Sequence, residues 1–353
     1  MNILILALSG IGDALMFTPA LRLLRRALPG AQIDALVMFK GVKDMYERNE
    51  DINNVFYSDF IKQGILPSLN YVLKLRNKYD YSINVYPSNR KEYNIINYLI
   101  GADKRAGVNY LRMNTRELGF LNNVSVMEDD AVHNVRTNIK LVEKLFNKNF
   151  TEEPDLNFSI TNEDEEFAAS YLQKLNIEQS DIIIGFHPGS ATMKNHINRR
   201  WEPEKFVQLG KKLISEHKAK ILVFGGSEEE ELKKGIVKSI DSANGISTEA
   251  ENLPQSAAVI KRCNVFVTND SSLMHVASAM KRKVVAVIGP TNTAYIHPWN
   301  TEYKTVSLNL ECSPCFFYSP RPLICHRTDV KYKCIKELQV DMVYNAVESF
   351  LEK

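Results

Sequence analysis

Short apolar runs alternate with amphipathic segments along most of the chain. Ile3–Leu8 is continuously apolar, as expected of a central parallel strand that is buried on both faces. Leucines and alanines at helical spacing follow between Thr18 and Leu28, and Pro29-Gly30 ends that segment. The same alternation predicts two more strands and two more helices in this half of the chain: Ile33–Met38, Tyr81–Val85, Tyr71–Lys78 and His133–Leu145.

A polar, acidic stretch around Thr151–Asp164 interrupts the alternation and is a candidate linker. The pattern then resumes, with predicted strands at 182–186, 221–224, 265–268 and 284–288 and predicted helices at 206–217, 228–240 and 273–280. We therefore predict an α/β protein of two Rossmann-like, doubly wound domains, residues 1–160 and 161–340, that face a central cleft. We expect the C-terminal segment 341–353 to form a helix that packs back on the first domain.

Composition and charge exclude some classes of protein but do not indicate a particular function. The chain has 353 residues, 44% of them hydrophobic and 24% charged, which is typical of a globular protein. A net charge of only +2 argues against nucleic acid as the main partner. No segment reaches the roughly 18 apolar residues of a membrane span, and the first apolar run has no basic leader, so we expect a cytoplasmic protein.

The first strand ends in a loop that carries a carboxylate. In open α/β sheets, ligands bind beyond the carboxyl ends of the strands. This makes Gly10, Gly12 and Asp13 candidate site residues. Leu15 stands where the dinucleotide-binding fingerprint needs its third glycine, so that fingerprint fails. Asp13 would repel a pyrophosphate and is better suited to an uncharged hydroxyl. The alternative is that Asp13 only caps the following helix.

The strands of the second half end in loops that suit an anion. Hydroxyls and backbone N–H groups at the start of a helix favour phosphate, and cations nearby add to this. The candidate anion-binding residues of these loops are Gly189, Ser190, Arg199, Asp270, Ser271, Ser272, His275, Gly289 and Thr291. Two alternatives stay open: His275 is a core histidine, and the cationic stretch 198–201 is a solvated surface cluster.

Three motifs in this order resemble glycosyltransferase family 9, the bacterial lipopolysaccharide heptosyltransferases. They are LSGIGDALMFTPALRLLRRALPGAQID near the start, HPGS with RRWEPEKFVQL in the middle, and VFVTNDSSLMHVASAMKRKVVAVIGPT near the end. The resemblance runs over nearly the whole chain and implies the GT-B fold.

The resemblance also implies roles for individual residues. Asp13 would be the general base that takes the proton of the acceptor hydroxyl. The loop and helix start around Asp270 would hold the diphosphate and sugar of the donor. Two departures stand out: Ser272 replaces the small glycine common in the family, and Arg199 stands where a lysine is usual. Lys194, in the longer loop before it, is an alternative cation.

The function implied by the resemblance is inverting transfer of a heptose or related sugar from a nucleotide-diphosphate donor, ADP-heptose, to a lipopolysaccharide-core or other glycan acceptor. A lipid-linked acceptor would bring peripheral contact with the inner membrane surface, and the chemistry itself needs no metal. One alternative is an NAD-dependent nucleotide-sugar epimerase or dehydrogenase, which the broken glycine fingerprint and the lack of a fitting Y-x-x-x-K pair disfavour. The other is a non-catalytic sugar-nucleotide-binding protein.

Four cysteines gather in the last part of the chain. Cys312, Cys315, Cys325 and Cys334 offer four thiolates, which a structural zinc ion accepts in tetrahedral geometry, and His326 is a substitute ligand. Only the first pair has the C-x-x-C spacing, so free or incidentally paired thiols are the alternative.

Overall fold

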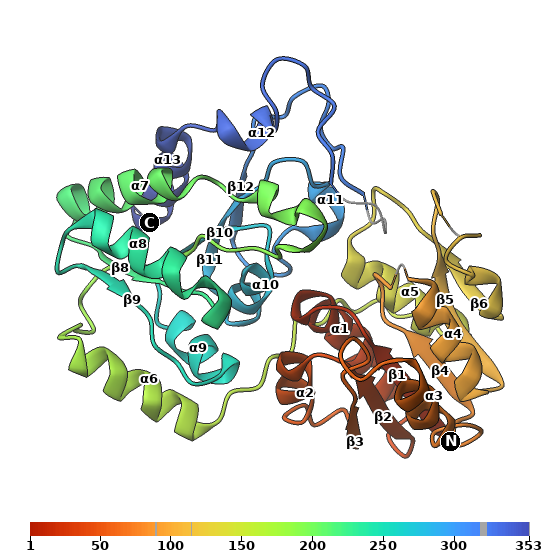
Figure 1. Cartoon of the computed structure of the whole chain (residues 1–353). Helices are drawn as coiled ribbons and strands as arrows, with labels where there is room; N and C mark the ends of the chain where they lie inside the picture. The colour runs from red at the N-terminus through yellow and green to blue at the C-terminus, as the bar shows by residue number, and fades with distance from the viewer. Residues whose placement is uncertain (89, 114, 318–322, 353) are drawn as a thin grey trace. The chain divides into compact units, whose positions relative to one another are not determined.

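The computed structural model of the chain describes residues 1–88, 90–113, 115–317 and 323–352 (Figure 1). It divides into two compact units, which we call unit 1, mainly Met1–Ser159, and unit 2, mainly the residues from Ile160 onward. No helix of the described residues is long and apolar enough to cross a membrane.

Unit 1 is a parallel sheet with the strand order β3-β2-β1-β4-β5-β6. Its strands are β1 (Asn2–Ala7), β2 (Gln32–Val37), β3 (Asn54–Tyr57), β4 (Tyr81–Asn84), β5 (Lys104–Asn109) and β6 (Val124–Met127). The connecting helices are α1 (Ile11–Ala27), α2 (Lys40–Tyr46), α3 (Ile65–Leu73), α4 (Lys91–Ile100), the short 3-10 helix η1 (Gly119–Leu121) and α5 (Asn134–Phe146). β1 lies in the middle of the sheet, and all but its first residue are buried.

Unit 2 repeats this design with the strand order β12-β11-β10-β7-β8-β9. Its strands are β7 (Ile183–His187), β8 (Lys220–Val223), β9 (Gly245–Ser247), β10 (Val265–Asn269), β11 (Lys283–Val287) and β12 (Tyr303–Val306). Its longer helices are α6 (Asn162–Lys174), α7 (Pro203–His217), α8 (Glu230–Ile240), α9 (Leu253–Ile260), α10 (Ser272–Ala279) and α13 (Val340–Leu351). The shorter ones are η2 (Met193–Arg199), η3 (Ser227–Glu229) and α12 (Lys333–Lys336). The short helix α11 (Thr293–Ile296) belongs mostly to unit 1, which includes Ala294–Ile296. Two parallel six-stranded sheets confirm the predicted pair of Rossmann-like units.

The first helix begins earlier than its periodicity predicts. α1 starts at Ile11, directly after β1, and Pro19 lies inside it although a proline there removes one backbone hydrogen bond. The structure compensates for that loss, because the Thr18 hydroxyl donates to the Leu15 carbonyl at 2.7 Å, the oxygen that the Pro19 nitrogen cannot reach. The same hydroxyl accepts from the Asn157 amide at 2.8 Å.

The helix predicted over 71–78 is misplaced. α3 starts at Ile65, after Gly64 with its φ of +80°, and ends at Leu73. Pro67 lies in its first turn, where the missing N–H has no intrahelical partner to lose. The pattern also missed the short strands at the sheet edges, since edge strands with exposed residues carry little apolar periodicity.

The acidic stretch proposed as a linker is partly helical. Residues 147–161 contain no helix or strand, but α6 begins at Asn162 with a capping box between Thr161 and Asp164. The acidic residues at the end of the stretch thus form the first turn of a helix, where negative charge is favoured.

The C-terminal helix does not pack back on the first unit, contrary to our prediction. α13 packs on α7 and on β10, β11 and β12, and five of its side chains join the unit 2 core. Val343, Val347 and Phe350 recur at a spacing of four and three residues, so they form one apolar stripe that unit 2 covers. Periodicity showed that stripe, but it could not show which sheet would bury it.

Candidate functional site

The loop after β1 places a carboxylate in the first turn of α1. Gly10 is the N-cap with a φ of −68°, and Asp13 is the third helical residue, partly exposed, so Asp13 is not the N-cap residue. A side chain at Gly10 would come only within 4.0 Å of the Asp13 carboxylate. The glycine is therefore not required for the turn, and what it leaves is an open approach beside Asp13. Gly12 is the second residue of α1.

Two buried phenols lie within electrostatic reach of Asp13. Burial raises the pKa of Tyr93 to about 12, and the negative charge of Asp13 adds to that rise. The pKa of Tyr110 is raised by burial first and by Asp13 to a smaller extent. Both phenols therefore lie close enough to the Asp13 carboxylate, at the carboxyl end of the unit 1 sheet, for their pKa values to respond to it.

In unit 2 the strand-end loops converge on Asp270, directly after β10. Its Oδ2 accepts from Arg199 Nη1 at 2.5 Å and from the Thr291 hydroxyl at 2.7 Å. The Arg199 and Asp270 side chains are each only 11% exposed. The structure thus brings together three of the predicted donor-binding residues from three loops, since parallel strands end at one edge of the sheet.

Arg199 is held on several sides. Its guanidinium lies 5.1 Å from the centre of the Phe316 ring and 3.4 Å from His196 Nδ1. Its buried Nε–H has no hydrogen-bond partner among the residues described. The predicted cation is therefore positioned and largely neutralised by Asp270, and it is not part of a solvated surface cluster.

A second network joins three loops and was not predicted. His187, the last residue of β7, lies 2.8 Å from the Ser271 hydroxyl through Nδ1 and 3.2 Å from Glu229 through Nε2. Arg200 contacts the same carboxylate at 3.3 Å and donates to the Ser190 carbonyl at 2.5 Å. Burial by itself would raise the pKa of Glu229. The net result is a pKa below the usual value, mainly because His187 donates a hydrogen bond and adds its charge.

Gly189 lies directly against the carboxylate of this network. A Cβ there would lie 1.7 Å from Glu229 Oε1, so a side chain at 189 would displace that carboxylate from its present position. Gly189 therefore leaves room for Glu229 to contact His187 and Arg200. The sequence held a signal for the network in His187 of the HPGS motif, but Glu229 lies in a run of glutamates that resembles an ordinary helix start.

The other predicted donor-binding residues are distributed around these networks. Ser271 and Ser272 are the N-cap and first residue of α10, and both are partly exposed. Ser190 is buried, and a Cβ at Gly289 would lie 3.2 Å from Ile335. Lys194 belongs to η2, but its side chain lies outside the part of the chain that the structure describes.

His275 lies in α10 and is buried. Burial lowers its pKa to about 4, against a smaller opposing effect of Asp270, so the imidazole is neutral. Its Nδ1 has no hydrogen-bond partner among the described residues. This is the environment that the core-histidine alternative predicts, and contact with a phosphate stays a prediction.

The four C-terminal cysteines lie near one another, and none is in a disulfide. Burial raises the pKa of Cys334 to about 11, with further contributions from the other three thiols. The Tyr332 amide donates to Cys325 Sγ at 3.2 Å, and Arg327 donates to Cys312 Sγ at 3.5 Å. Within the described chain no three of these sulfurs come within 4.8 Å of one another, so a closed tetrahedral set is not formed and the zinc site stays a prediction. The fifth cysteine, Cys263, is buried two residues before β10.

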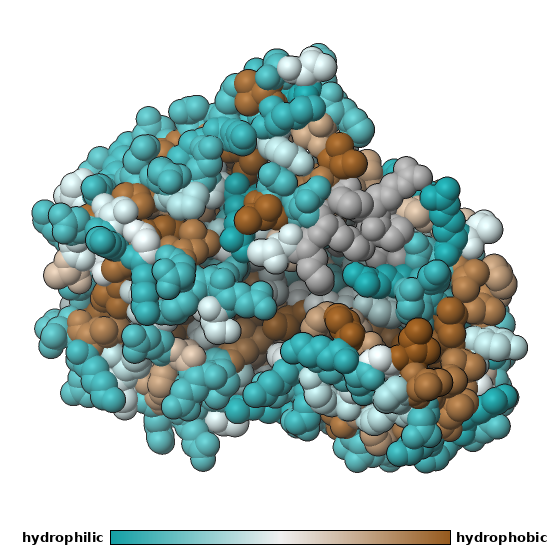
Figure 2. Space-filling model, in the orientation of Figure 1, coloured by the Kyte–Doolittle hydropathy of each residue, from teal (hydrophilic) through white to brown (hydrophobic). Residues whose placement is uncertain are grey.

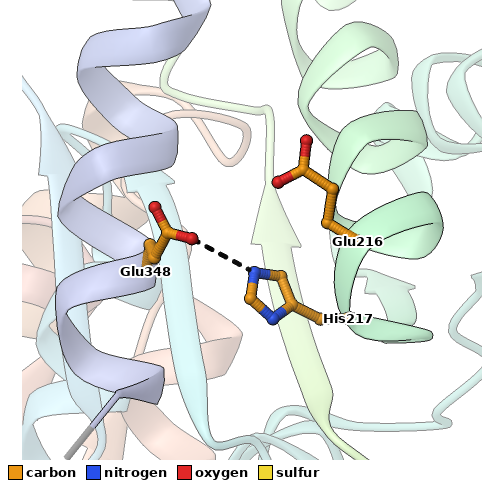
Figure 3. Close-up of side chains that lie close together, drawn as sticks. All are labelled: Glu216, His217 and Glu348. Carbon is orange, nitrogen blue, oxygen red and sulfur yellow. Dashed lines mark ion pairs between the residues drawn. The ribbon is translucent and has the colours of Figure 1, made fainter.

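Only one group of three metal-ligating side chains comes that close in the described residues. Figure 3 shows it: Glu216 and His217 at the end of α7 and Glu348 on α13. The Tyr344 hydroxyl lies 2.5 Å from Glu216, 2.8 Å from Glu348 and 3.0 Å from His217 Nε2. The hydroxyl thus fills the space where a cation would stand, and the group fastens α13 to α7.

The comparisons with known proteins now identify the family. The sequence profile described as glycosyltransferase family 9 (heptosyltransferase) matches residues 71–321. The chain belongs to glycosyltransferase family 9. A similar curated relative is lipooligosaccharide heptosyltransferase 2 of Campylobacter jejuni subsp. jejuni serotype O:6, 30% identical over 190 residues. That match covers 52% of this chain and 55% of the relative, so it spans about half the length of the curated protein.

Solved structures of heptosyltransferases share the fold. The E. coli ADP-heptose lipopolysaccharide heptosyltransferase II aligns with a TM-score of 0.76 and 20% identity, over 100% of this chain and 99% of that one. The E. coli heptosyltransferase WaaC with ADP-2-deoxy-2-fluoro heptose aligns with a TM-score of 0.67 and 18% identity, over 100% and 99%. At these identities the likeness establishes the architecture, which is the GT-B fold predicted from the motifs.

Proposed function

We propose that this chain transfers a heptose from ADP-heptose to a lipopolysaccharide-core or other glycan acceptor, with inversion at the anomeric carbon. The match to family 9 over residues 71–321 carries the proposal, because the family is described as heptosyltransferases. Two further observations support it: the curated relatives are named heptosyltransferase 2, and ADP-heptose appears in the name of a solved enzyme of the same fold.

On the acceptor side, Asp13 is the proposed general base. The attacking hydroxyl needs a proton acceptor within about 3 Å, and the carboxylate stands partly exposed beside the small Gly10. The N-terminus of α1 stabilises the anion and so weakens Asp13 as a base. Proton transfer is therefore late in this mechanism, when the attacking oxygen has already become acidic.

On the donor side, the loops around Asp270 are the proposed diphosphate site. Negative charge builds on the leaving diphosphate, and N–H donors together with cations stabilise it. Ser271 and Ser272 begin α10, and Arg199 adds a positioned guanidinium. A phosphate oxygen that reached the buried Nε–H of Arg199 would satisfy a donor that otherwise costs stability. Because Asp270 neutralises Arg199, the positive contribution to this site comes from the N-terminus of α10, and Arg199 adds a hydrogen-bond donor.

The test is turnover with defined donors. Purified protein is incubated with ADP-heptose and a heptose-deficient core acceptor, and ADP release and the glycosylated product are measured. We expect ADP release that depends on both substrates and a product of inverted anomeric configuration. Binding of ADP-heptose without turnover would instead support the non-catalytic alternative. The NAD-dependent alternative finds no support in the family match, and parallel incubation with NAD and other nucleotide sugars tests it directly.

A further inference from the structure

Unit 1 carries an apolar surface that no part of the described structure covers. Ile65 and Leu66 at the start of α3 are 84% and 78% exposed. We call the α3–α4 patch the set of exposed hydrophobic side chains on and around these two helices, namely Ile61, Ile65, Leu66, Leu69, Leu73, Ile95 and Tyr98. Figure 2 shows hydrophobic residues gathered over these two helices.

Helical geometry makes these side chains one surface. Ile65, Leu69 and Leu73 follow one another at a spacing of four, so they lie along one side of α3. Ile95 and Tyr98 have the matching spacing of three on α4, which packs against α3. Among the residues of α3 only Val72 is buried, so most of the apolar surface of this helix does not contribute to the core.

An apolar patch of this extent indicates a binding surface. Scattered exposed hydrophobic residues are normal, but a contiguous group marks an interaction site with protein or membrane. Fully burying one leucine or isoleucine gains roughly 1.5–3 kcal/mol, so leaving several in water is costly without an occupant.

The charge around the patch favours an anionic lipid surface. Residues 59–105 hold eight Lys or Arg against four Asp or Glu, a net charge of +4, while the whole chain has +2. Lys62, Lys74, Arg76, Lys78, Lys91 and Lys104 are all exposed. Each basic residue near an anionic membrane surface contributes about 1 kcal/mol to binding. A protein partner would need a complementary acidic face, whereas anionic headgroups over acyl chains match both the charge and the apolar character.

We propose that the α3–α4 patch binds unit 1 to the surface of an anionic bilayer, with α3 lying in the interface. The apolar side of α3 enters the boundary between headgroups and acyl chains, and the flanking lysines contact the headgroups. Because Asp13 belongs to the same unit, this binding brings the proposed base to the surface where a lipid-linked acceptor is located. The proposal goes beyond the transfer reaction and does not depend on it.

The experiment is vesicle co-sedimentation without donor or acceptor. We expect the wild-type protein to sediment with vesicles of about 30 mol% phosphatidylglycerol in phosphatidylcholine, less with pure phosphatidylcholine, and less at high salt. The double variant Ile65→Ser/Leu66→Ser should lower the partition coefficient at least about tenfold, since two side chains lose their apolar burial. The matched control is Met127→Ser/Met342→Ser, which removes two exposed methionines outside the patch and should bind as wild type.

Three results would overturn the proposal. The first is a wild-type protein that stays in the supernatant with anionic vesicles. The second is equal binding by the patch variant and the control, with unchanged urea midpoints to show that both fold. The third is a wild-type dimer in sedimentation velocity that the patch variant converts to monomer, because the patch would then be a contact between copies of this chain. None of these results bears on ADP-heptose turnover, so the two proposals fail separately.

Discussion

At the scale of single residues, burial and close neighbours determine the charge and the contacts of the polar side chains in unit 2. Arg199 and Asp270 neutralise each other at 2.5 Å, and Glu229 occupies the space beside Gly189. His275 is buried and neutral. Each of these roles depends on a neighbour distant in sequence, which is why spacing alone indicated the residues without their partners.

His275 predicts how stability changes with pH. Its pKa is about 4 in the folded chain and about 6.5 when unfolded, so between these values the unfolded state binds more protons. Stability therefore falls as pH falls through this range, by about 2 kcal/mol between pH 7 and pH 5. Urea unfolding of His275→Gln at both values should show a pH difference smaller by that amount. The exposed His326→Gln is the control and should keep the wild-type difference, and an unchanged difference in His275→Gln would contradict the prediction.

At the scale of elements, side-chain hydrogen bonds determine where helices run and how they end. α1 continues past Pro19 because Thr18 satisfies the Leu15 carbonyl, and α6 begins where Thr161 and Asp164 form a capping box. α13 is fastened to α7 by Tyr344. The capping box and the Thr18 bond each join residues three positions apart, so local sequence carries both. The contact of Tyr344 instead depends on a helix that is distant in sequence.

Thr18→Val tests the compensation in α1. Valine keeps the shape of the side chain but leaves the Leu15 carbonyl and the Asn157 amide without the hydroxyl. An unsatisfied buried group costs about 1–3 kcal/mol, so the free energy of unfolding in urea should fall by at least that amount. The exposed Thr151→Val should change it little. A Thr18→Val protein as stable as the wild type would show that α1 does not need this bond.

The C-terminal loop tests the predicted zinc site. If its four cysteines hold zinc, protein purified without chelator should contain about one equivalent of metal, and a chelator should lower the melting temperature. The Cys312→Ser/Cys315→Ser variant should lose both the metal and the chelator effect, whereas Cys263→Ser should keep them. Metal-free protein with a melting temperature insensitive to chelator would instead favour free thiols.

At the scale of the whole molecule, the proposed chemistry is divided between two compact units. The proposed base belongs to unit 1 and the proposed diphosphate site to unit 2, each at the carboxyl edge of its own parallel sheet. Substitutions in the two units should therefore affect different steps of the reaction.

Asp13→Asn should lower kcat by about 10²–10⁴-fold, the usual contribution of a general base, and leave the affinity for ADP-heptose close to wild type.

Asp270→Asn should instead weaken donor binding, because it loosens Arg199 and Thr291 together. Calorimetry and steady-state kinetics separate the two effects, with the exposed Asp103→Asn and Asp341→Asn as controls. A kcat of Asp13→Asn within a few-fold of wild type would remove Asp13 from the mechanism, and unchanged donor affinity in Asp270→Asn would remove that residue from the site.

The sequence by itself determined the features that depend on neighbouring residues and on periodicity. The buried strands β1, β7 and β10 are apolar runs because both faces are covered, and they predicted two doubly wound units. The position of Asp13 after β1 and of Asp270 after β10 also follows from the chain alone, because a strand end is a local feature.

Only the tertiary structure decided the contacts that join distant segments. The Asp270 carboxylate meets Arg199 and Thr291, and His187 meets Glu229, because parallel strands bring their loops to one edge in an order that spacing does not encode. The same holds for α13, whose apolar stripe could pack on either sheet and is covered by unit 2. It also holds for α3, because hydrophobicity alone does not show that its leucines are exposed in the folded chain. Hydrophobicity is a property of the residue, but burial is a property of the folded molecule.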